Sequence, residues 1–385
     1  MKAAIIGASS EALHTIQLAK QLGLRVVAFD GNPEADGLKA ADEAVVVDIS
    51  NEDATIDAVR NVEADFVLTV PIGRYLTTIG AVNDALGLPG ITKTMAVNCT
   101  DKFLFHQKLQ ERQLRNCNCY CLPEDREKEL AIQYPAILKP RFGSGSRGIH
   151  YLENEHQLQL ALEQIGEEDY VLEECITGEE YGMDGAVIDG TFHMVLLRKK
   201  DNTPLPNRQA VAYYSVWEED SFYQPVYEYM KRVVEALGLS ECLLHADLIK
   251  GESGPFAIEV SARPSGHNLH NLFTPMATGV DVAKEYSCHR MGVEYSFAPS
   301  ERKRLSIHYF DMEGTVNHIP NGEEIKSTGA SVVKWNCNLA KGDILGSVSD
   351  GHSIMGRGYF ILEQNKKEEP AKQALMIKEL FHVGL

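Results

Sequence analysis

The chain has 385 residues, 44% hydrophobic and 24% charged, which is typical of a globular protein with roughly two to four domains or subdomains. Its 55 acidic residues outnumber 37 lysines and arginines, and the net charge of −18 argues against binding to nucleic acid or anionic lipid. We expect a cytoplasmic protein without a membrane span, because MKAAIIGASS shows no secretory pattern and no apolar run approaches the roughly 18 residues that a span needs.

The first hundred residues predict alternating strands and helices. AAIIGA and RVVAFD are typical of strands that flank a helix in SEALHTIQLAKQLG, and AVVVD, a helix over 52–62 and DFVLTV continue the alternation. We therefore expect a parallel sheet with flanking helices, closed by LGLPG at 86–90. The first turn has Gly7 as its only glycine, and the missing GxGxxG argues against a nicotinamide oxidoreductase.

An amphipathic helix is predicted in CTDKFLFHQKLQERQL, with Thr100 or Asp101 as its N-cap. Lys102 then lies in the first turn, where the helix dipole disfavours a cation. Such a lysine is either solvated or directed at an anion.

The segment CNCYC at 117–121 admits two interpretations. On a strand its three cysteines share one face, where cysteine behaves as a small buried apolar residue. A metal site is the alternative, but no CxxC pair or matching histidine spacing supports zinc. We expect all eight cysteines of the chain to be reduced thiols.

The stretch YPAILKPRFGSGSRGIHYL, residues 134–152, runs from a strand through a glycine-rich loop into a second strand. The loop from Gly143 to Gly148 contains Arg147 and exposes backbone N–H groups, a combination that suits phosphate. Lys139 precedes the glycines, so this is not a Walker loop. A flexible hairpin is the alternative.

Acidic residues cluster in DYVLEECITGEEYGMDGAVIDG, where Glu173, Glu174, Glu179 and Glu180 surround a turn between two predicted strands. Acidic residues this close together are usually a solvated edge. At such a hinge they are also acceptors for ribose hydroxyls and for the amino edge of adenine.

A hairpin is predicted in LLHADLIKGESGPFAIEVSARPSG, with two apolar strands on either side of KGESGP. Its alternation places Phe256, Ile258 and Val260 on one face and Glu259, Ser261 and Arg263 on the other.

The hairpin also predicts that Asp247 lies opposite Glu259. Facing carboxylates repel each other unless a cation lies between them, and magnesium suits such a pair. Arg263 on the same face could then hold an anionic substrate group. A surface hairpin with alternating polarity is the alternative.

The following segment, PSGHNLHN, contains His267, Asn268, His270 and Asn271. One interpretation is a polar loop that caps the next helix. The other is that His267 and Asn268 border an acceptor pocket, where they orient an amine or receive its proton.

Together these features resemble the ATP-grasp superfamily of carboxylate-amine ligases. The pattern has a lysine that opens a helix, a second lysine before a glycine-rich loop, an acidic hinge, and an Asp followed twelve residues later by Glu-x-Ser-x-Arg. The family usually has Asn where this chain has Ser261. The resemblance covers nearly the whole chain and is nearest to the L-amino acid ligases, and the first unit resembles that of carbamoyl phosphate synthetase, biotin carboxylase and the purine-pathway ligases.

The resemblance implies a fold of class α/β and α+β in three parts. A Rossmann-like preATP-grasp domain would occupy residues 1–98. An ATP-grasp domain would occupy 99–298, with 99–134 and 183–298 around a small subdomain at about 135–182. A C-terminal lid domain, with a helix in EPAKQALMIKEL, would occupy 299–385.

The resemblance also assigns roles to residues. The positions that would bind ATP are Lys102, Lys139, Gly143, Ser144, Gly145, Ser146, Glu173, Glu174, Ile176 and Glu180. Mg²⁺, or Mn²⁺ in its place, would be held by Asp247, Glu259 and Ser261, and the serine leaves the number of metal ions open. Arg263 and Lys139 would stabilise an acyl phosphate, and the substrates would meet His267, Asn268 and Arg357.

The implied reaction joins a small carboxylate, such as an amino acid, to an amine or thiol through an acyl phosphate, and releases ADP and phosphate. Two alternatives stay open: a purine-pathway type of ligase acting on a phosphorylated substrate, and a non-catalytic ATP-binding sensor. The sequence does not identify the substrates. Homodimers are common among the proteins that it resembles.

Overall fold

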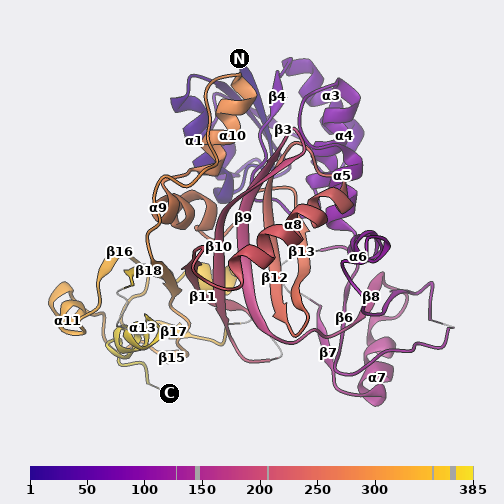
Figure 1. The fold of residues 1–385 in the computed structure, drawn as a ribbon. Coiled ribbons are helices and arrows are strands. Elements are labelled where there is room, and N and C mark those ends of the chain that lie inside the picture. Colours follow the sequence, from indigo (N-terminus) through magenta and orange to yellow (C-terminus); the bar gives the residue numbers. More distant parts are fainter. Residues whose placement is uncertain (127, 144–147, 206–207, 349–350, 365–369, 385) are drawn as a thin grey trace.

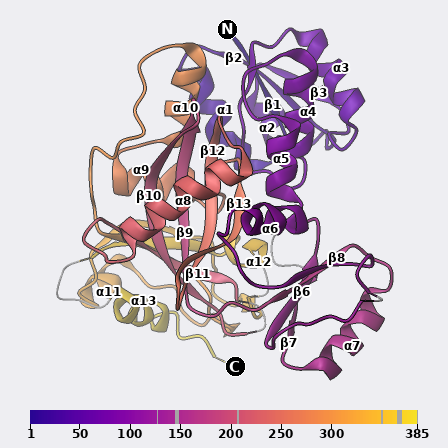
Figure 2. The ribbon, with the colours of Figure 1, turned by 45° about the vertical axis from the view of Figure 1, so that its right-hand side comes forward.

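The computed structural model describes residues 1–126, 128–143, 148–205, 208–348, 351–364 and 370–384. Three groups of elements are visible in both views, with the N-terminal unit at the top, a small sheet at the lower right and the C-terminal segment at the lower left (Figures 1 and 2). In these described residues no helix is long and apolar enough to cross a lipid bilayer.

The N-terminal unit is the predicted parallel sheet with flanking helices. Its strands lie in the order β3-β2-β1-β4, and all three pairings are parallel. Asp30 ends β2 and accepts a hydrogen bond from the N–H of Ala8 at 2.7 Å, so this carboxylate holds the first turn of the chain. The elements are β1 Lys2–Ile6, η1 Ser10–Ala12, α1 Leu13–Gln21, β2 Arg25–Asp30, α2 Asp36–Ala40, β3 Glu43–Val46, α3 Glu52–Val62, β4 Phe66–Val67, α4 Leu76–Leu86 and α5 Lys93–Thr100.

A small antiparallel sheet follows, in the order β5-β8-β6-β7, and helix α7 packs against it. It already begins with β5, ahead of the predicted subdomain start at about residue 135. Its elements, with the helix that precedes them, are α6 Lys102–Glu111, β5 Cys119–Leu122, β6 Ala136–Pro140, β7 His150–Leu152, α7 Glu155–Ile165 and β8 Tyr170–Glu174.

The largest sheet contains eight of the described strands, in the order β13-β12-β9-β10-β11-β14-β18-β16, and is antiparallel throughout. Helix α8 crosses one face in front of β9 and β12, and η2, α9 and α10 contact the other (Figure 1). Its elements are β9 Glu179–Ile188, β10 Thr191–Asn202, β11 Ala210–Val216, α8 Tyr223–Leu237, β12 Cys242–Gly251, β13 Gly254–Ser261, η2 Leu269–Phe273, α9 Thr274–Thr278, α10 Val282–Met291, β14 Leu305–Tyr309, β16 Val332–Cys337 and β18 Gly358–Glu363.

The C-terminal segment continues this large sheet. Strand β14 pairs with β11 and β18, so the segment from residue 299 onward shares backbone hydrogen bonds with the strands before it. The helix predicted near the C-terminus is confirmed as α13. The remaining elements are β15 Gly314–Thr315, α11 Gly322–Ser327, β17 Ile344–Leu345, α12 Gly351–Met355 and α13 Pro370–Glu379.

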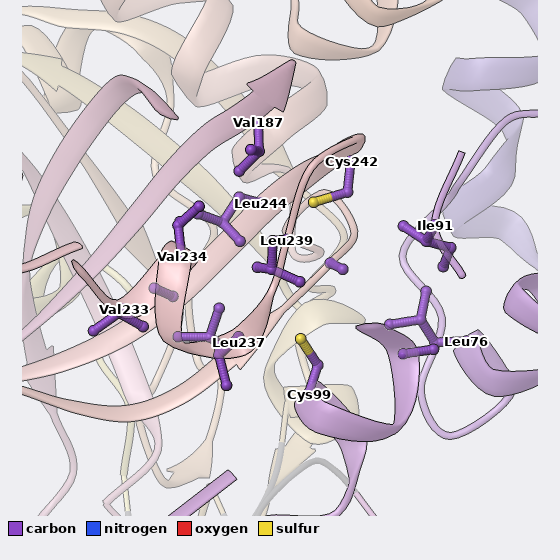
Figure 3. Close-up of a cluster of buried hydrophobic side chains, with 14 of the residues drawn as sticks. Leu76, Ile91, Cys99, Val187, Val233, Val234, Leu237, Leu239, Cys242 and Leu244 are labelled. Atoms are coloured by element: carbon purple, nitrogen blue, oxygen red, sulfur yellow. The ribbon is translucent and has the colours of Figure 1, made fainter. Parts of the chain in front are cut away.

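A continuous hydrophobic core joins the N-terminal unit to the large sheet. Leu76 and Cys99, from α4 and α5, lie in one buried cluster with Leu237 of α8 and Leu244 of β12 (Figure 3). The side-chain amide of Asn98 donates to the carbonyl of Leu237 at 3.0 Å and closes the same interface. The N-terminal unit is therefore fixed against the strands that carry the predicted metal ligands.

We predict that Leu237→Ala lowers the free energy of unfolding by roughly 2–5 kcal/mol, because it leaves a cavity in this core. Urea denaturation measures the change. The control is Leu375→Ala on α13, where the side chain is 55% exposed and a change within about 0.5 kcal/mol is expected. Equal losses in the two variants would contradict the shared core.

Candidate active site

Lys102 lies at the start of α6, as the sequence predicts. Asp101 is the N-cap and accepts from the N–H groups of Phe103 and Leu104 at 3.0 and 3.1 Å, whereas Thr100 ends the preceding helix. Arg141 holds the same carboxylate through two hydrogen bonds of 3.0 and 2.8 Å. The cap is therefore held by Arg141, a residue between the end of β6 and the glycine-rich loop.

The ammonium of Lys102 donates to the carbonyl of Gly143 at 2.8 Å, so it joins the helix to the first glycine of that loop. Burial lowers the pKa of Lys102, while the nearby Glu259 carboxylate opposes this shift. Ser144, Gly145 and Ser146 lie outside the described residues, and their predicted role stays untested.

Lys139 and Glu173 form a buried ion pair between β6 and β8. Arg115 approaches the other oxygen of Glu173 at 3.7 Å, and it also donates to His106 at 3.0 Å and to the carbonyl of Ala257 at 3.0 Å. Burial alone would raise the pKa of Glu173, but Lys139 and Arg115 outweigh it and hold the pKa below its usual value. The carboxylate is thus ionised between two cations.

The cysteine segment agrees largely with the apolar interpretation. Cys117 and Cys121 are buried, and burial raises the pKa of each thiol to about 11. Cys117 precedes β5, so only Cys119 and Cys121 lie on the strand. Ligand atoms of His106, Cys119 and Glu173 come within 4.8 Å of one another, but both ring nitrogens of His106 already have hydrogen-bond partners, Arg115 and the carbonyl of Cys117.

The acidic hinge lies between β8 of the small sheet and β9 of the large one. Glu174 accepts from the side-chain amide of Asn118 at 3.3 Å, and Glu180 pairs with Arg208. Ile176, half-buried, lies in the short connection, close to the turn of the β12–β13 hairpin at Gly251. The structure therefore brings all four predicted adenine and ribose residues to the junction of the two sheets.

Asp247 faces Glu259 across β12 and β13, as predicted. Glu259, Ser261 and Arg263 line one cavity, as their predicted common face implies. The apolar row expected along β13 is wrong, however, because a register shift passes over Ile258. Ala257 and Val260 are the fully buried residues, instead of the predicted row of Phe256, Ile258 and Val260.

The two carboxylates and their neighbours offer a set of oxygen ligands. Asp247 contacts Lys200 at 2.5 Å and His245 at 3.4 Å, and the hydroxyl of Ser261 donates to Glu259 at 3.3 Å. Burial would raise the pKa of Asp247, but Lys200 and His245 outweigh it and keep the group ionised. Two carboxylates and a hydroxyl are hard oxygen donors, which fits Mg²⁺.

A cavity connects Glu259 and Ser261 with Arg263. Arg263 follows β13 and donates to the carbonyl of Pro264 at 2.8 Å, and burial lowers its pKa while Glu259 opposes the shift. The residues that line the cavity come from the N-terminal unit, α6, the glycine-rich loop and β13; they are Ile72, Gly73, Arg74, Leu76, Cys99, Thr100, Lys102, Gly143, Glu259, Ser261 and Arg263. Five residues predicted for phosphate, metal or acyl phosphate thus share one cavity, whereas Asp247 and Lys139 are not among the described residues that line it.

His267 and Asn268 follow Arg263 along the chain and are not among the described residues that line this cavity. Both have left-handed backbones, with φ of 60° and 58°, and the side chain of Asn268 caps no helix. Tyr309 donates to the carbonyl of His267 at 2.5 Å, and the imidazole lies directly beside Gly351. The helix-capping interpretation of this segment is therefore wrong for Asn268.

Arg357 is not brought to these residues. It lies just before β18, and its guanidinium donates to the backbone carbonyls of Phe310, Met312 and Gly346 at 3.4, 2.8 and 2.7 Å. Arg357 does not have the predicted orientation toward a substrate, because its guanidinium N–H groups donate to these three backbone carbonyls.

Sequence reasoning missed three charged or polar neighbours of the site: Arg115, His106 and Lys200. Lys200 gave one signal, since it ends the triplet RKK, which directly follows the largely apolar run FHMVLL; the structure places it on β10 with its side chain buried. Arg115 and His106 gave none, because tertiary contacts alone bring them to Glu173.

Comparison with known proteins finds a domain match and similar proteins. Residues 132–270 match the family model of the ATP-grasp domain. Dapdiamide A synthase of Enterobacter agglomerans is 23% identical over 341 residues, which cover 79% of this chain and 77% of that protein.

Solved structures share the fold over almost the full length. An L-amino acid ligase from Bacillus licheniformis matches with a TM-score of 0.79 and 21% identity, over 99% of this chain and 97% of its own. N5-carboxyaminoimidazole synthetase from Staphylococcus aureus, complexed with ADP, matches with a TM-score of 0.74 and 14% identity, over 99% and 96%. The fold is that of ATP-grasp ligases.

We predict that Glu173→Gln lowers the free energy of unfolding at pH 7 by about 3 kcal/mol or more, because two buried cations lose their partner. The pKa of Glu173 is lower in the folded protein than its ordinary value of 4.5. Its charge therefore stabilises the fold above pH 4.5, and this stabilisation is lost as the pH falls through the pKa of the folded state. The difference between parent and variant should therefore shrink below pH 4.5.

Urea denaturation between pH 7 and pH 3 measures this convergence, with Glu174→Gln as the matched control. A difference that stays constant with pH would show that the charge of Glu173 does not contribute.

Proposed function

We propose that this chain, which carries an ATP-grasp domain within an ATP-grasp ligase fold, is an ATP-dependent ligase that joins a small carboxylate to an amine. The observation that supports this most is the cavity that Lys102, Gly143, Glu259, Ser261 and Arg263 line together. A phosphate site, a metal site and an anion-binding arginine around one space are what acyl phosphate formation requires.

The nucleotide site lies between the two sheets. The adenine would lie at Glu173, Glu174 and Ile176, the ribose at Glu180, and the phosphates at Lys102, Lys139 and the glycine-rich loop. Lys139 and Glu173 are already paired, so the ammonium is held in place before the phosphates arrive.

Asp247 and Glu259, with the hydroxyl of Ser261, would hold magnesium. When bound, it neutralises phosphate charge and lowers the barrier to phosphoryl transfer. Lys200 contacts Asp247, so it balances one carboxylate of the pair.

The proposed reaction has two steps, formation of an acyl phosphate and its attack by an amine. A substrate carboxylate attacks the γ-phosphate of ATP, and ADP leaves as the acyl phosphate forms. Arg263 and Lys139 neutralise the charge that develops on the transferring group, with Arg263 at the acyl end. An amine displaces phosphate and loses a proton, for which the imidazole of His267, four residues after Arg263, is a candidate acceptor.

The relatives favour amino acids as substrates, because an L-amino acid ligase and dapdiamide A synthase are among them. A purine-pathway type of reaction on a phosphorylated substrate is the second candidate, supported by N5-carboxyaminoimidazole synthetase. The division at residues 98 and 298, the cytoplasmic location and a homodimer stay predictions.

We predict that Lys139→Met lowers ATP-dependent phosphate release by about 100-fold or more, since it removes a positive charge from the phosphate site. Phosphate release is measured with ATP, magnesium and pairs of the twenty amino acids. Lys128→Met, at an exposed surface position, is the matched control and should keep parent activity. Unchanged release by Lys139→Met would remove the ATP-site assignment.

We predict that Glu259→Gln raises the magnesium concentration for half-maximal activity by about tenfold, a loss of roughly 1.4 kcal/mol in metal affinity. A magnesium titration of phosphate release measures it. Glu252→Gln in the exposed turn of the same hairpin should titrate like the parent. If the two variants titrate alike, the facing carboxylates hold no metal.

A further inference from the structure

Arg74 is a cation of the proposed active site that the proposed reaction does not use. It lies in the loop between β4 and α4, and with its neighbours Ile72 and Gly73 it lines the cavity that contains Lys102 and Arg263. In the order β3-β2-β1-β4 the strand order reverses between β1 and β4, and ligands of open α/β sheets bind in the crevice at such a point. Arg74 therefore lies where the N-terminal unit is expected to meet a ligand.

The loop that carries Arg74 is held on both sides. The side chain of Ile72 lies where a Cβ of Gly7 would begin, so the loop packs against the one after β1. The carbonyl of Arg74 accepts from the N–H and the hydroxyl of Thr77 at 3.3 and 3.1 Å, in the first turn of α4. Leu76 is buried in the core that joins α4 to the large sheet (Figure 3). The backbone of Arg74 is therefore fixed relative to the cavity.

The guanidinium of Arg74 forms no ion pair with an acidic residue in the part of the chain that the structure describes. It donates to the hydroxyl of Tyr75 at 3.4 Å and lies 5.1 Å from the centre of that ring. Hydrogen bonds from Ser50 lower the pKa of Asp48, and the charge of Arg74 adds to this shift without contact between the two. By contrast Arg25, also exposed in the same unit, pairs with a carboxylate at 3.3 Å.

The balance of charge in the cavity favours an anionic ligand. The charged residues of its described lining are three cations and one carboxylate: Arg74, Lys102, Arg263 and Glu259. Under the proposed function Lys102 meets ATP phosphates, Arg263 meets the acyl phosphate and Glu259 meets magnesium, so only the charge of Arg74 is left over. A planar guanidinium binds a carboxylate or a phosphate through two parallel N–H groups. The remaining charge therefore suits a further group of this kind.

We propose that Arg74 binds a second anionic group of the acid that is activated, so that this acid carries a carboxylate or a phosphate besides the carboxylate that is phosphorylated. This inference rests on the proposed ligase function. Arg263 follows β13, whereas Arg74 belongs to the N-terminal unit, so an acid bound by both lies between these two parts of the chain. An acid with a single carboxylate has no group for Arg74 and binds less tightly.

The test uses hydroxylamine in place of the unknown amine. Hydroxylamine attacks an acyl phosphate, forms a hydroxamate and releases phosphate, so each acid is assayed with ATP, magnesium and hydroxylamine beside a partner that lacks the second charge. The carboxylate arm compares glutarate with glutaramate, succinate with succinamate and glutamate with glutamine. The phosphate arm compares phosphoserine with serine and 3-phosphoglycerate with glycerate. In one arm the parent should show at least about a tenfold higher kcat/KM for the acid with the second anionic group.

Arg74→Gln removes the charge but keeps a polar side chain. It should raise the KM for the preferred acid at least about tenfold, while the KM values for ATP and for the partner without the second charge stay within about twofold. Arg74→Lys keeps the charge without the planar fork and should retain the preference in part. Arg60→Gln, at an exposed position of α3 in the same unit, is the matched control and should behave like the parent.

Failure of the inference is distinguishable from failure of the proposed function. If the parent forms hydroxamate without preferring a second anionic group, or if Arg74→Gln keeps that preference, the inference is overturned. If Arg74→Gln raises the KM for ATP instead, Arg74 binds the nucleotide and the inference is likewise overturned. If the parent forms no hydroxamate with any acid of either arm, the proposed ligase function itself is overturned.

Discussion

The position of the two facing carboxylates depends on one irregularity in the pairing of β12 with β13. The turn pairs Gly251 with Gly254, and a regular hairpin from that turn would place Asp247 opposite Ile258. Because Ile258 is passed over, Asp247 faces Glu259 and His245 faces Ser261. A shift of one residue moves a side chain to the other face of a sheet, so without the bulge the two carboxylates would point in opposite directions.

Charge balance around the site is maintained by the chain itself. Glu173 lies between Lys139 and Arg115, and Asp247 lies against Lys200 and His245. An isolated buried charge is costly, and each of these groups has a partner of opposite sign within contact distance. Under the proposed function, phosphate and metal would therefore enter a region whose charges are already positioned, so little reorganisation would be needed when charge moves during the reaction.

Much of the fold and site could be predicted because the signals are local. The first strands, the helix over 52–62 and Asp101 as N-cap follow from periodicity and capping chemistry within a few residues. The cation partners could not be predicted in this way: Arg115 reaches Glu173 from 58 positions earlier in the chain, and Lys200 reaches Asp247 from a strand that is not its neighbour in the sheet. Arg357 was misjudged for the same reason, since the carbonyls that hold it come from other segments.

The pairing of strands in the large sheet determines which part of the molecule can rotate as a rigid body. Rotating the C-terminal segment as a rigid body would break the hydrogen bonds between β11 and β14, which are a continuous ladder. The small sheet shares no ladder with the large one among the described strands, and β8 leads into β9 through residues 175–178. Opening and closing of the small sheet over a nucleotide would then require torsional changes at that connection, but would break no hydrogen bonds between strands. Lys139 would move with the small sheet, while Asp247 and Glu259 would stay with the large one.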